Sequence, residues 1–84
     1  LGRIDPETRA IVPPIHVATT YLRDPDNAYT SGYVYGRPDN ATVREAEAVL
    51  AMLEEAKAGA LLFASGMAAA TAVFQALDPG DHVV

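Results

Sequence analysis

The sequence predicts an α/β fold in which an extended arm over residues 1–41 precedes the beginning of a larger domain over residues 42–84. The arm holds most of the prolines and all four tyrosines, and it shows neither a sustained helical nor a sustained strand period. An amphipathic pattern begins at Thr42, and a strand, helix and strand pattern follows it. This order predicts one helix and then a βαβ unit, which normally lies inside a larger parallel sheet.

The arm is expected to be extended and to lie against another surface. Proline lacks an amide donor and keeps the residue before it out of the helical region. Pro13 and Pro14 therefore predict an extended segment, and the run Asp24–Asn27 predicts a turn.

The first helix is expected to begin at Thr42 and to end near Ala58. Thr42 and Glu45 have the spacing of a capping box, in which each side chain bonds the other residue's amide. Gly59 is a natural left-handed stop. Apolar residues recur three and four positions apart along one face: Val43, Ala46, Leu50 and Leu53.

The βαβ unit is expected over residues 60–84. Residues 60–64 form a continuous apolar run, which is typical of a strand buried on both faces. Ser65 and Gly66 turn the chain into an alanine-rich helix over Met67–Leu77, and residues 78–81 end it with turn chemistry. Residues 82–84 would begin a second strand, so we expect the sequence to be part of a longer chain.

Composition limits the function classes. The 84 residues include no cysteine and carry a formal net charge of −5. This charge repels a phosphate backbone and disfavours nucleic-acid binding. No apolar run approaches the roughly 20 residues that a membrane helix needs. We therefore expect at most one domain of a soluble protein, with the cytoplasm as the default compartment.

The Ser65–Gly66–Met67 turn is the first candidate binding site. It lies between the end of a predicted strand and the start of a helix, where unpaired amides and the helix dipole favour an anion such as phosphate. A simple N-cap at Ser65 explains the same residues equally well. The glycine pattern of a dinucleotide site and the lysine of a P-loop are both absent from the sequence.

Tyr35 and Arg37 form the second candidate, in a tyrosine-rich loop with glycines at 32 and 36. A guanidinium offers a planar fork of donors and a phenol one more, which together can hold a phosphate. A surface tyrosine cluster or an oligomer contact is the alternative.

The histidine and lysine side chains do not predict a further site. His16 and His82 lack partners at metal-ligand spacing, so no metal site is predicted. Lys57 is the only lysine and lies near a helix end, where a solvated cation is favourable, so we predict no Schiff-base lysine among these residues.

Four motifs in one order resemble a known enzyme family. They are Val12–Ile15, Tyr35–Thr42, Leu61–Ala69 and Pro79–Val84. Together they resemble the amino-terminal part of the Cys/Met metabolism enzymes that use pyridoxal 5'-phosphate, or PLP, such as cystathionine γ-synthase, cystathionine γ-lyase, methionine γ-lyase and O-acyl-homoserine sulfhydrylases. Ala41 departs from this family's usual Asn-Pro-Thr, but proline is not required at a helix start.

The resemblance implies the large domain of a fold type I, aspartate-aminotransferase-like PLP enzyme. It implies that Tyr35 and Arg37 reach the cofactor phosphate of a neighbouring subunit, and that Ser65, Gly66 and Met67 hold the phosphate of their own subunit's cofactor. It further implies a homodimer or homotetramer that eliminates or replaces groups at the γ or β carbon of a sulfur-containing amino acid. The catalytic lysine would lie outside these residues. A noncatalytic phosphate-binding or oligomerisation module is the alternative.

Overall fold

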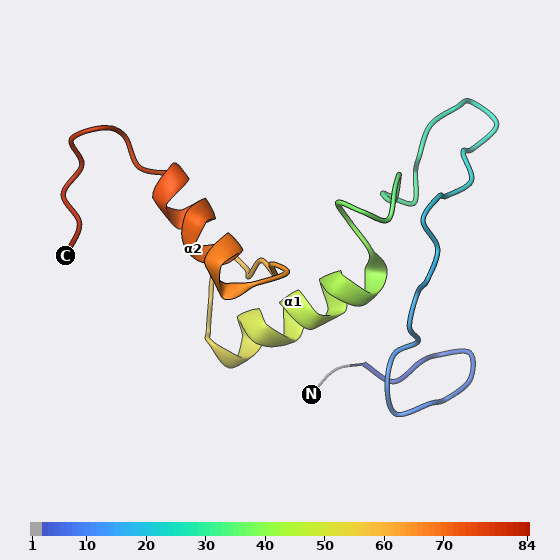
Figure 1. Cartoon of the computed structure of the whole chain (residues 1–84). Helices are drawn as coiled ribbons and strands as arrows, with labels where there is room; N and C mark the ends of the chain where they lie inside the picture. Colours follow the sequence, from blue (N-terminus) through green and yellow to red (C-terminus); the bar gives the residue numbers. More distant parts are fainter. Residues whose placement is uncertain (1–2) are drawn as a thin grey trace.

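The computed structural model describes residues 3–84, which contain two helices, α1 (Ala41–Leu53) and α2 (Gly66–Gln75). Figure 1 shows the arm running from the amino terminus to α1, and α2 leading away toward the carboxyl terminus. Within residues 3–84, the β-structure consists of one isolated antiparallel bridge, between Thr20 and Tyr35. Neither helix in this range has the length and hydropathy to cross a membrane.

Helix α1 is capped by Asn40 and not by the predicted box at Thr42. The Asn40 side chain accepts a hydrogen bond from the Thr42 amide at 2.8 Å, and its Nδ2 donates to the His16 carbonyl at 3.0 Å. The Thr42 hydroxyl accepts from the His16 amide at 2.7 Å instead of closing a box with Glu45. The predicted capping box was wrong because the side chains of Asn40 and Thr42 both bind the arm at His16.

Helix α1 ends at Leu53, five residues before the predicted end at Ala58. The Ala56 amide donates to the Ala51 carbonyl at 2.8 Å and the Glu55 amide to the Met52 carbonyl at 3.3 Å, which is the pattern of a Schellman motif. Glu55 has the left-handed φ of 52° that this motif needs. The sequence pointed to Gly59, which is left-handed too but closes the following turn, with its amide donating to Ala56.

Helix α2 confirms the predicted second helix, beginning one residue earlier and ending two residues earlier. Its N-cap is Ser65, whose hydroxyl accepts from the Ala68 amide at 3.1 Å. After the helix, the predicted turn is present: the Asp81 amide donates to the Asp78 carbonyl, the Asp78 amide donates to the Asp81 carboxylate, and Gly80 has a φ of +97°.

The two predicted strands, over residues 60–64 and 82–84, do not form in the part of the chain that the structure describes. A strand exists only when its amides and carbonyls pair with a neighbouring strand. Here the Leu62 amide donates to the Glu47 side chain at 2.9 Å instead of to a strand. The βαβ arrangement is therefore not confirmed, although its helix is present.

The part of the chain that the structure describes is open and has no core of its own. Its Cα radius of gyration is 16.7 Å, against about 12 Å for a compact domain of this length. Its accessible surface is 7265 Å², against about 4,800 Å² for a folded monomer of this mass. No hydrophobic side chain among residues 3–84 is buried.

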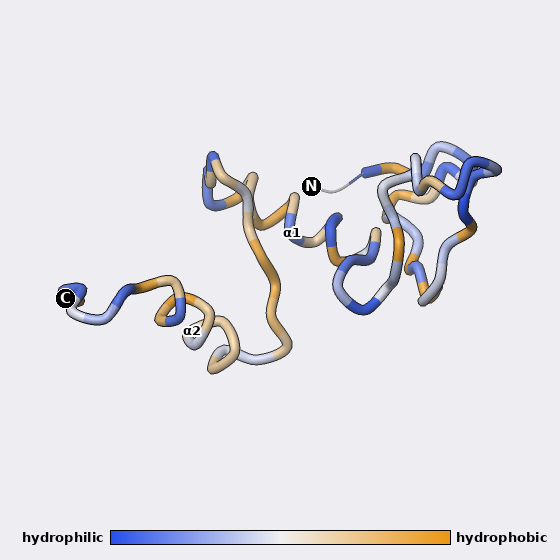
Figure 2. The backbone as a smooth tube through the Cα atoms, turned by 90° about the horizontal axis from the view of Figure 1, so that it is seen from above, coloured by the Kyte–Doolittle hydropathy of each residue, from blue (hydrophilic) through white to orange (hydrophobic). Residues whose placement is uncertain are grey.

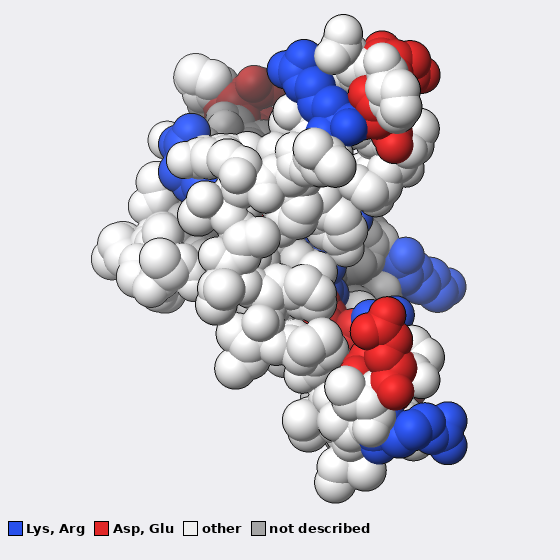
Figure 3. Space-filling model, turned by 90° about the vertical axis from the view of Figure 1, so that its right-hand side faces the viewer, with Lys and Arg blue, Asp and Glu red and all other residues white. Residues whose placement is uncertain are grey.

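Apolar surface is consequently left uncovered. Figure 2 shows apolar chain along the segment that leads into α2, and Figure 3 shows a face whose centre carries no Lys, Arg, Asp or Glu. Leu61 is 77% exposed, which is unfavourable for a leucine in water. The exposed apolar side chains, such as Leu61, need a covering surface that residues 3–84 do not supply.

Candidate functional site

The first predicted site lies at the amino end of α2. Ser65 caps the helix through its hydroxyl, and its carbonyl accepts from the Ala69 amide at 3.1 Å. Gly66 and Met67 occupy the first two helical positions, where the amides have no intrahelical acceptor. Neither amide donates to a protein group in residues 3–84. The turn therefore presents two unpaired amides at the positive end of a helix dipole.

The space in front of this turn is open. A Cβ atom placed on Gly66 would meet no heavy atom within 4 Å, and Gly66 does not have a left-handed φ. Met67 is 76% exposed. An anion can therefore approach the amides without displacing protein atoms.

The second predicted site is on a loop that folds back on the arm. The bridge pairs Tyr35 with Thr20, and the Gly36 amide donates to the Thr19 carbonyl at 2.7 Å. A Cβ atom on Gly36 would lie 2.6 Å from the Ala18 carbonyl oxygen. Only glycine permits this close approach, which fixes the backbone between Tyr35 and Arg37.

Arg37 and Tyr35 are neighbours, as predicted. The guanidinium carbon of Arg37 lies 5.6 Å from the centre of the Tyr35 ring, within range of a cation–π interaction. Both side chains are exposed, and across residues 3–84 Arg37 forms no ion pair or hydrogen bond. Its donors are thus available to a ligand.

A cavity of about 390 Å³ connects this loop to the segment before α2. It is lined by Arg37 and its neighbours to Asn40, by Val43 and Glu47 of α1, and by residues 62–64. Ser65, Gly66 and Met67 do not line it. The structure brings Arg37 close to the chain that enters α2, but it does not join the two predicted sites into one.

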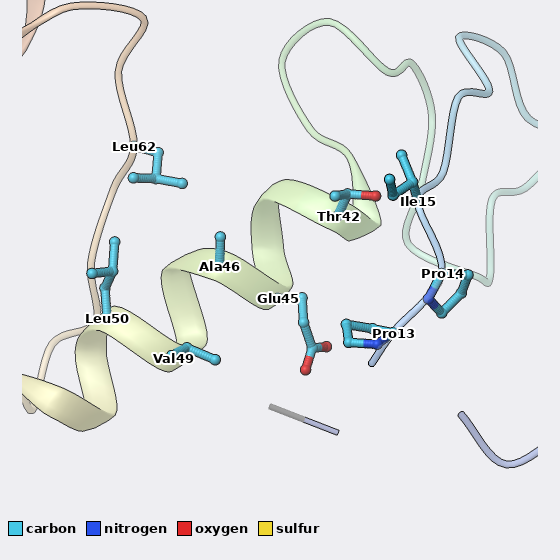
Figure 4. A pocket seen from close by; sticks show the side chains of 9 residues that line it. All are labelled: Pro13, Pro14, Ile15, Thr42, Glu45, Ala46, Val49, Leu50 and Leu62. Atoms are coloured by element: carbon cyan, nitrogen blue, oxygen red, sulfur yellow. The ribbon is translucent and has the colours of Figure 1, made fainter. Parts of the chain in front are cut away.

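A larger apolar groove runs along the other side of α1 (Figure 4). Its volume is about 560 Å³, and Figure 4 shows its lining side chains: Pro13, Pro14, Ile15, Thr42, Glu45, Ala46, Val49, Leu50 and Leu62. None of the predicted site residues lines it. Since it offers few donors for an anion, we place the candidate chemistry at the two polar sites and not in this groove.

Sequence reasoning missed the residues that hold these sites in place. The motifs and the helix pattern described above did not single out Arg44 or Glu47. In the structure Arg44 forms an ion pair with Asp39, and this guanidinium, which donates to the carboxylate, holds the pKa of Asp39 below its usual value. The opposite charges of Asp39 and Arg44, five residues apart across a helix start, were the available signal.

Comparison with known proteins identifies the family. A family model described as Cys/Met metabolism PLP-dependent enzyme matches residues 2–84. The chain belongs to this family of PLP-dependent enzymes. Membership confirms the resemblance carried by the four sequence motifs, makes PLP the cofactor, and implies the fold type I α/β architecture.

Several curated relatives are similar over nearly the whole chain. A probable cystathionine gamma-synthase of Herpetosiphon aurantiacus is 45% identical over 82 residues, covering 95% of this chain and 25% of that protein. A cystathionine beta-lyase of Coxiella burnetii is 42% identical over 80 residues, covering 95% and 20%. A cystathionine gamma-lyase of Bacillus subtilis is also 42% identical over 80 residues, covering 95% and 21%.

The chain thus spans a fifth to a quarter of the length of the curated relatives it matches. No solved structure matches the sequence.

The donors at the two sites fit the phosphate of PLP. A phosphate carries close to two negative charges and only acceptor oxygens at neutral pH, so it needs several N–H or O–H donors. The α2 turn offers the unpaired amides of Gly66 and Met67 beside open space. The Tyr35 phenol and the Arg37 guanidinium offer further donors. In a chain of net charge −5, these are local positive sites for an anion.

Proposed function

We propose that the complete protein is a PLP-dependent lyase or transferase that forms or cleaves cystathionine, or a related sulfur-containing or O-acyl amino acid. Three relatives named for cystathionine, each at least 42% identical, support this proposal. Reaction would take place by elimination or replacement at the γ or β carbon. The bound cofactor supplies an electron sink for negative charge that develops on the substrate carbons.

These residues would supply phosphate-binding groups and not the catalytic base. In this proposal the amides of Gly66 and Met67, with Ser65 fixing the turn, bind the phosphate of their own subunit's cofactor. Two open amides on a capped helix are the observation that carries this assignment. In this proposal the cofactor lysine is not Lys57, the one lysine among these 84 residues, which is exposed and follows the end of α1.

Tyr35 and Arg37 would bind the phosphate of a neighbouring subunit's cofactor, in a homodimer or homotetramer. This proposal rests on the free guanidinium of Arg37 and on the exposed arm. Residues 1–41 would then act as an arm that reaches the neighbour, and residues 42–84 as the start of the PLP-binding domain. We propose further that residues 60–64 and 82–84 become parallel strands when they pair with other strands of that domain, and that the enzyme acts in the cytoplasm.

The experiment uses the complete protein, purified without added cofactor. We expect bound PLP, detected by its visible absorbance and by phosphate analysis, at one molecule per subunit. We also expect turnover of cystathionine, or its formation from an O-acyl-homoserine and cysteine, measured by chromatography of the products. Bound PLP without turnover of any of these amino acids would overturn the substrate class. Absence of PLP after incubation with excess cofactor would overturn the enzyme assignment in favour of a noncatalytic module.

A further inference from the structure

Arg44 connects helix α1 to both ends of the loop that carries Tyr35 and Arg37. At the end of the loop, its Nε donates to Asp39 Oδ1 at 2.6 Å, and its Nη2 donates to Asp39 Oδ2. At the start, the same Nη2 donates to the Gly32 carbonyl at 3.3 Å. One guanidinium therefore spans residues 32–39 from the first turn of α1.

The aromatic side chains of the arm extend this connection. The guanidinium carbon of Arg44 lies 4.2 Å from the centre of the Tyr33 ring, a shorter distance than that between Arg37 and Tyr35. Tyr33 in turn stacks on Tyr21, with ring centres 5.4 Å apart and an interplanar angle of 26°. Both rings are half-buried, although residues 3–84 bury no hydrophobic side chain completely. The stack holds the incoming arm and the returning loop side by side.

These contacts engage Nε and Nη2 of Arg44 with the loop and place its guanidinium on the Tyr33 ring. A guanidinium has five N–H donors in a fixed planar fork, and this one faces Asp39, the Gly32 carbonyl and the Tyr33 ring. Lysine cannot reproduce such a set of contacts, because an ammonium is a point charge without a planar fork. Arg37, seven residues earlier, has the same side chain and lies near the Tyr35 ring, but within residues 3–84 its guanidinium forms no ion pair or hydrogen bond.

We propose that Arg44 is a positioning residue that fixes the loop 32–39, and through it the Arg37 guanidinium, at the place where the cofactor phosphate binds. This inference rests on the proposed phosphate role of Arg37. It assigns the two arginines different tasks: Arg37 touches the phosphate, and Arg44 sets where Arg37 lies.

Electrostatics agree with this geometry. The hydrogen bonds from Arg44 hold the pKa of Asp39 below its ordinary value, and those to Asp39 raise the pKa of Arg44. Both residues are therefore charged throughout the neutral range. The ion pair is partly exposed, so its value lies in orienting the loop more than in stabilising the fold.

A double-mutant cycle on the complete protein tests the proposal. The measured quantity is the dissociation constant for PLP, from titration of the cofactor-free protein followed by cofactor absorbance. We expect Arg44→Gln to weaken PLP binding about tenfold, since residues that share one network of contacts are energetically coupled. We expect Arg44→Lys to bind PLP nearly as weakly as Arg44→Gln does. In the Arg37→Ala background, Arg44→Gln should change the affinity less than twofold, because the group it positions is gone.

Arg3→Gln is the matched control. Arg3 also forms an ion pair with α1, to Glu45 at 3.5 Å, but within residues 3–84 no hydrogen bond or ion pair joins its side chain to the loop. It should leave PLP affinity unchanged while removing the same charge. Additive effects of Arg44→Gln and Arg37→Ala would overturn the positioning role. A lack of effect of Arg37→Ala, by contrast, would overturn the proposed phosphate role of Arg37.

A second measurement reads the loop itself and needs no cofactor. Chymotrypsin cleaves after tyrosine, so digestion of the cofactor-free complete protein, followed by mass spectrometry, reports opening of the loop at Tyr33 and Tyr35. We expect these cuts to appear several times faster in Arg44→Gln than in the Arg3→Gln control. Equal rates, with both variants equally stable to heat, would show that Arg44 does not hold the loop and would overturn the inference.

Discussion

The carboxylate of Glu47, on helix α1, accepts a hydrogen bond from the backbone amide of Leu62 at 2.9 Å. Glu47 is one turn after Arg44 on the same helix. Arg44 holds the loop that carries Arg37, and Glu47 holds the segment that leads to Ser65. One helix therefore contacts both the loop that carries Arg37 and the segment that leads into the Ser65–Met67 turn.

We expect Glu47→Ala to loosen residues 60–64 and to weaken PLP binding in the complete protein. The substitution removes the acceptor for the Leu62 amide, a loss of about 1 kcal/mol. Glu47→Gln keeps an acceptor oxygen and should have a smaller effect. Hydrogen exchange of residues 60–64, measured by mass spectrometry, should rise more in Glu47→Ala than in Glu47→Gln. Glu45→Ala, on the same helix, is the control, and similar exchange in both alanine variants would contradict the prediction.

We expect Arg37→Ala to weaken PLP binding in the neighbouring subunit. Hydrogen bonds to charged groups are worth about 1.5 to 3 kcal/mol each, so affinity should fall at least about tenfold. Mixing Arg37→Ala subunits with subunits that lack the family's cofactor lysine shows whether Arg37 binds the phosphate in its own subunit or in the neighbouring one. If Arg37 acts in the neighbouring subunit, each mixed dimer has one site that contains both the cofactor lysine and Arg37. Activity then returns on mixing. Activity that stays absent in isolated mixed dimers would mean that Arg37 acts in its own subunit.

We expect Gly66→Val to abolish tight PLP binding without destabilising the cofactor-free protein. No heavy atom lies within 4 Å of the added Cβ, so the new side chain meets only the space that the phosphate would fill. Met67→Leu keeps the amide and a similar volume, and should bind PLP as the parent does. The comparison is a PLP titration together with the thermal midpoint of each cofactor-free variant. Tight binding by Gly66→Val would reduce Ser65 to a simple helix cap.

We expect the loop 32–39 to open in acid. Its Asp39 carboxyl has a pKa below the ordinary value of 3.8, because it accepts hydrogen bonds from Arg44. A carboxyl with a lowered pKa in the folded state stabilises that state above its unfolded pKa, and the contribution is lost as the pH falls through the folded value. The loop therefore loses this stabilisation below pH 3.8.

Hydrogen exchange of residues 32–39, corrected for the intrinsic effect of pH, should rise in that range. Asp39→Asn removes the titrating group, so the variant should show fast exchange at pH 6 and no further acid-induced opening. A parent protein whose loop exchange is constant down to pH 2.5 would contradict this prediction.

We expect the 84-residue chain alone to show no cooperative thermal unfolding. It buries no hydrophobic side chain among residues 3–84, whereas ordering the backbone costs about 1 to 2 kcal/mol per residue. Calorimetry and circular dichroism of the isolated chain provide the measurement. A sharp heat-capacity peak from a monomer would falsify the prediction, and a peak that depends on concentration would reveal association of the exposed apolar surface.

The sequence by itself determined the local elements and the family. Ser65 before an alanine run is sufficient for a capped helix, since an N-cap and high helix propensity act within a few residues. The turn at residues 78–81 follows from its Asp-Pro-Gly-Asp chemistry in the same way. Four motifs in order were sufficient for the family, because a family pattern depends on residue types and spacing and not on contacts.

Only the tertiary structure decided which side chains hold these elements together. Thr42 could cap its own helix or bind the arm, and the position of the His16 backbone decided for the arm. Arg44 could have been a solvated charge, and the return of the loop gave it Asp39, Gly32 and Tyr33 as partners. The apolar run at residues 60–64 becomes a strand only when a neighbouring strand pairs with it, and the residue pattern alone does not supply that partner. Such contacts join residues far apart in the chain, which local patterns do not encode.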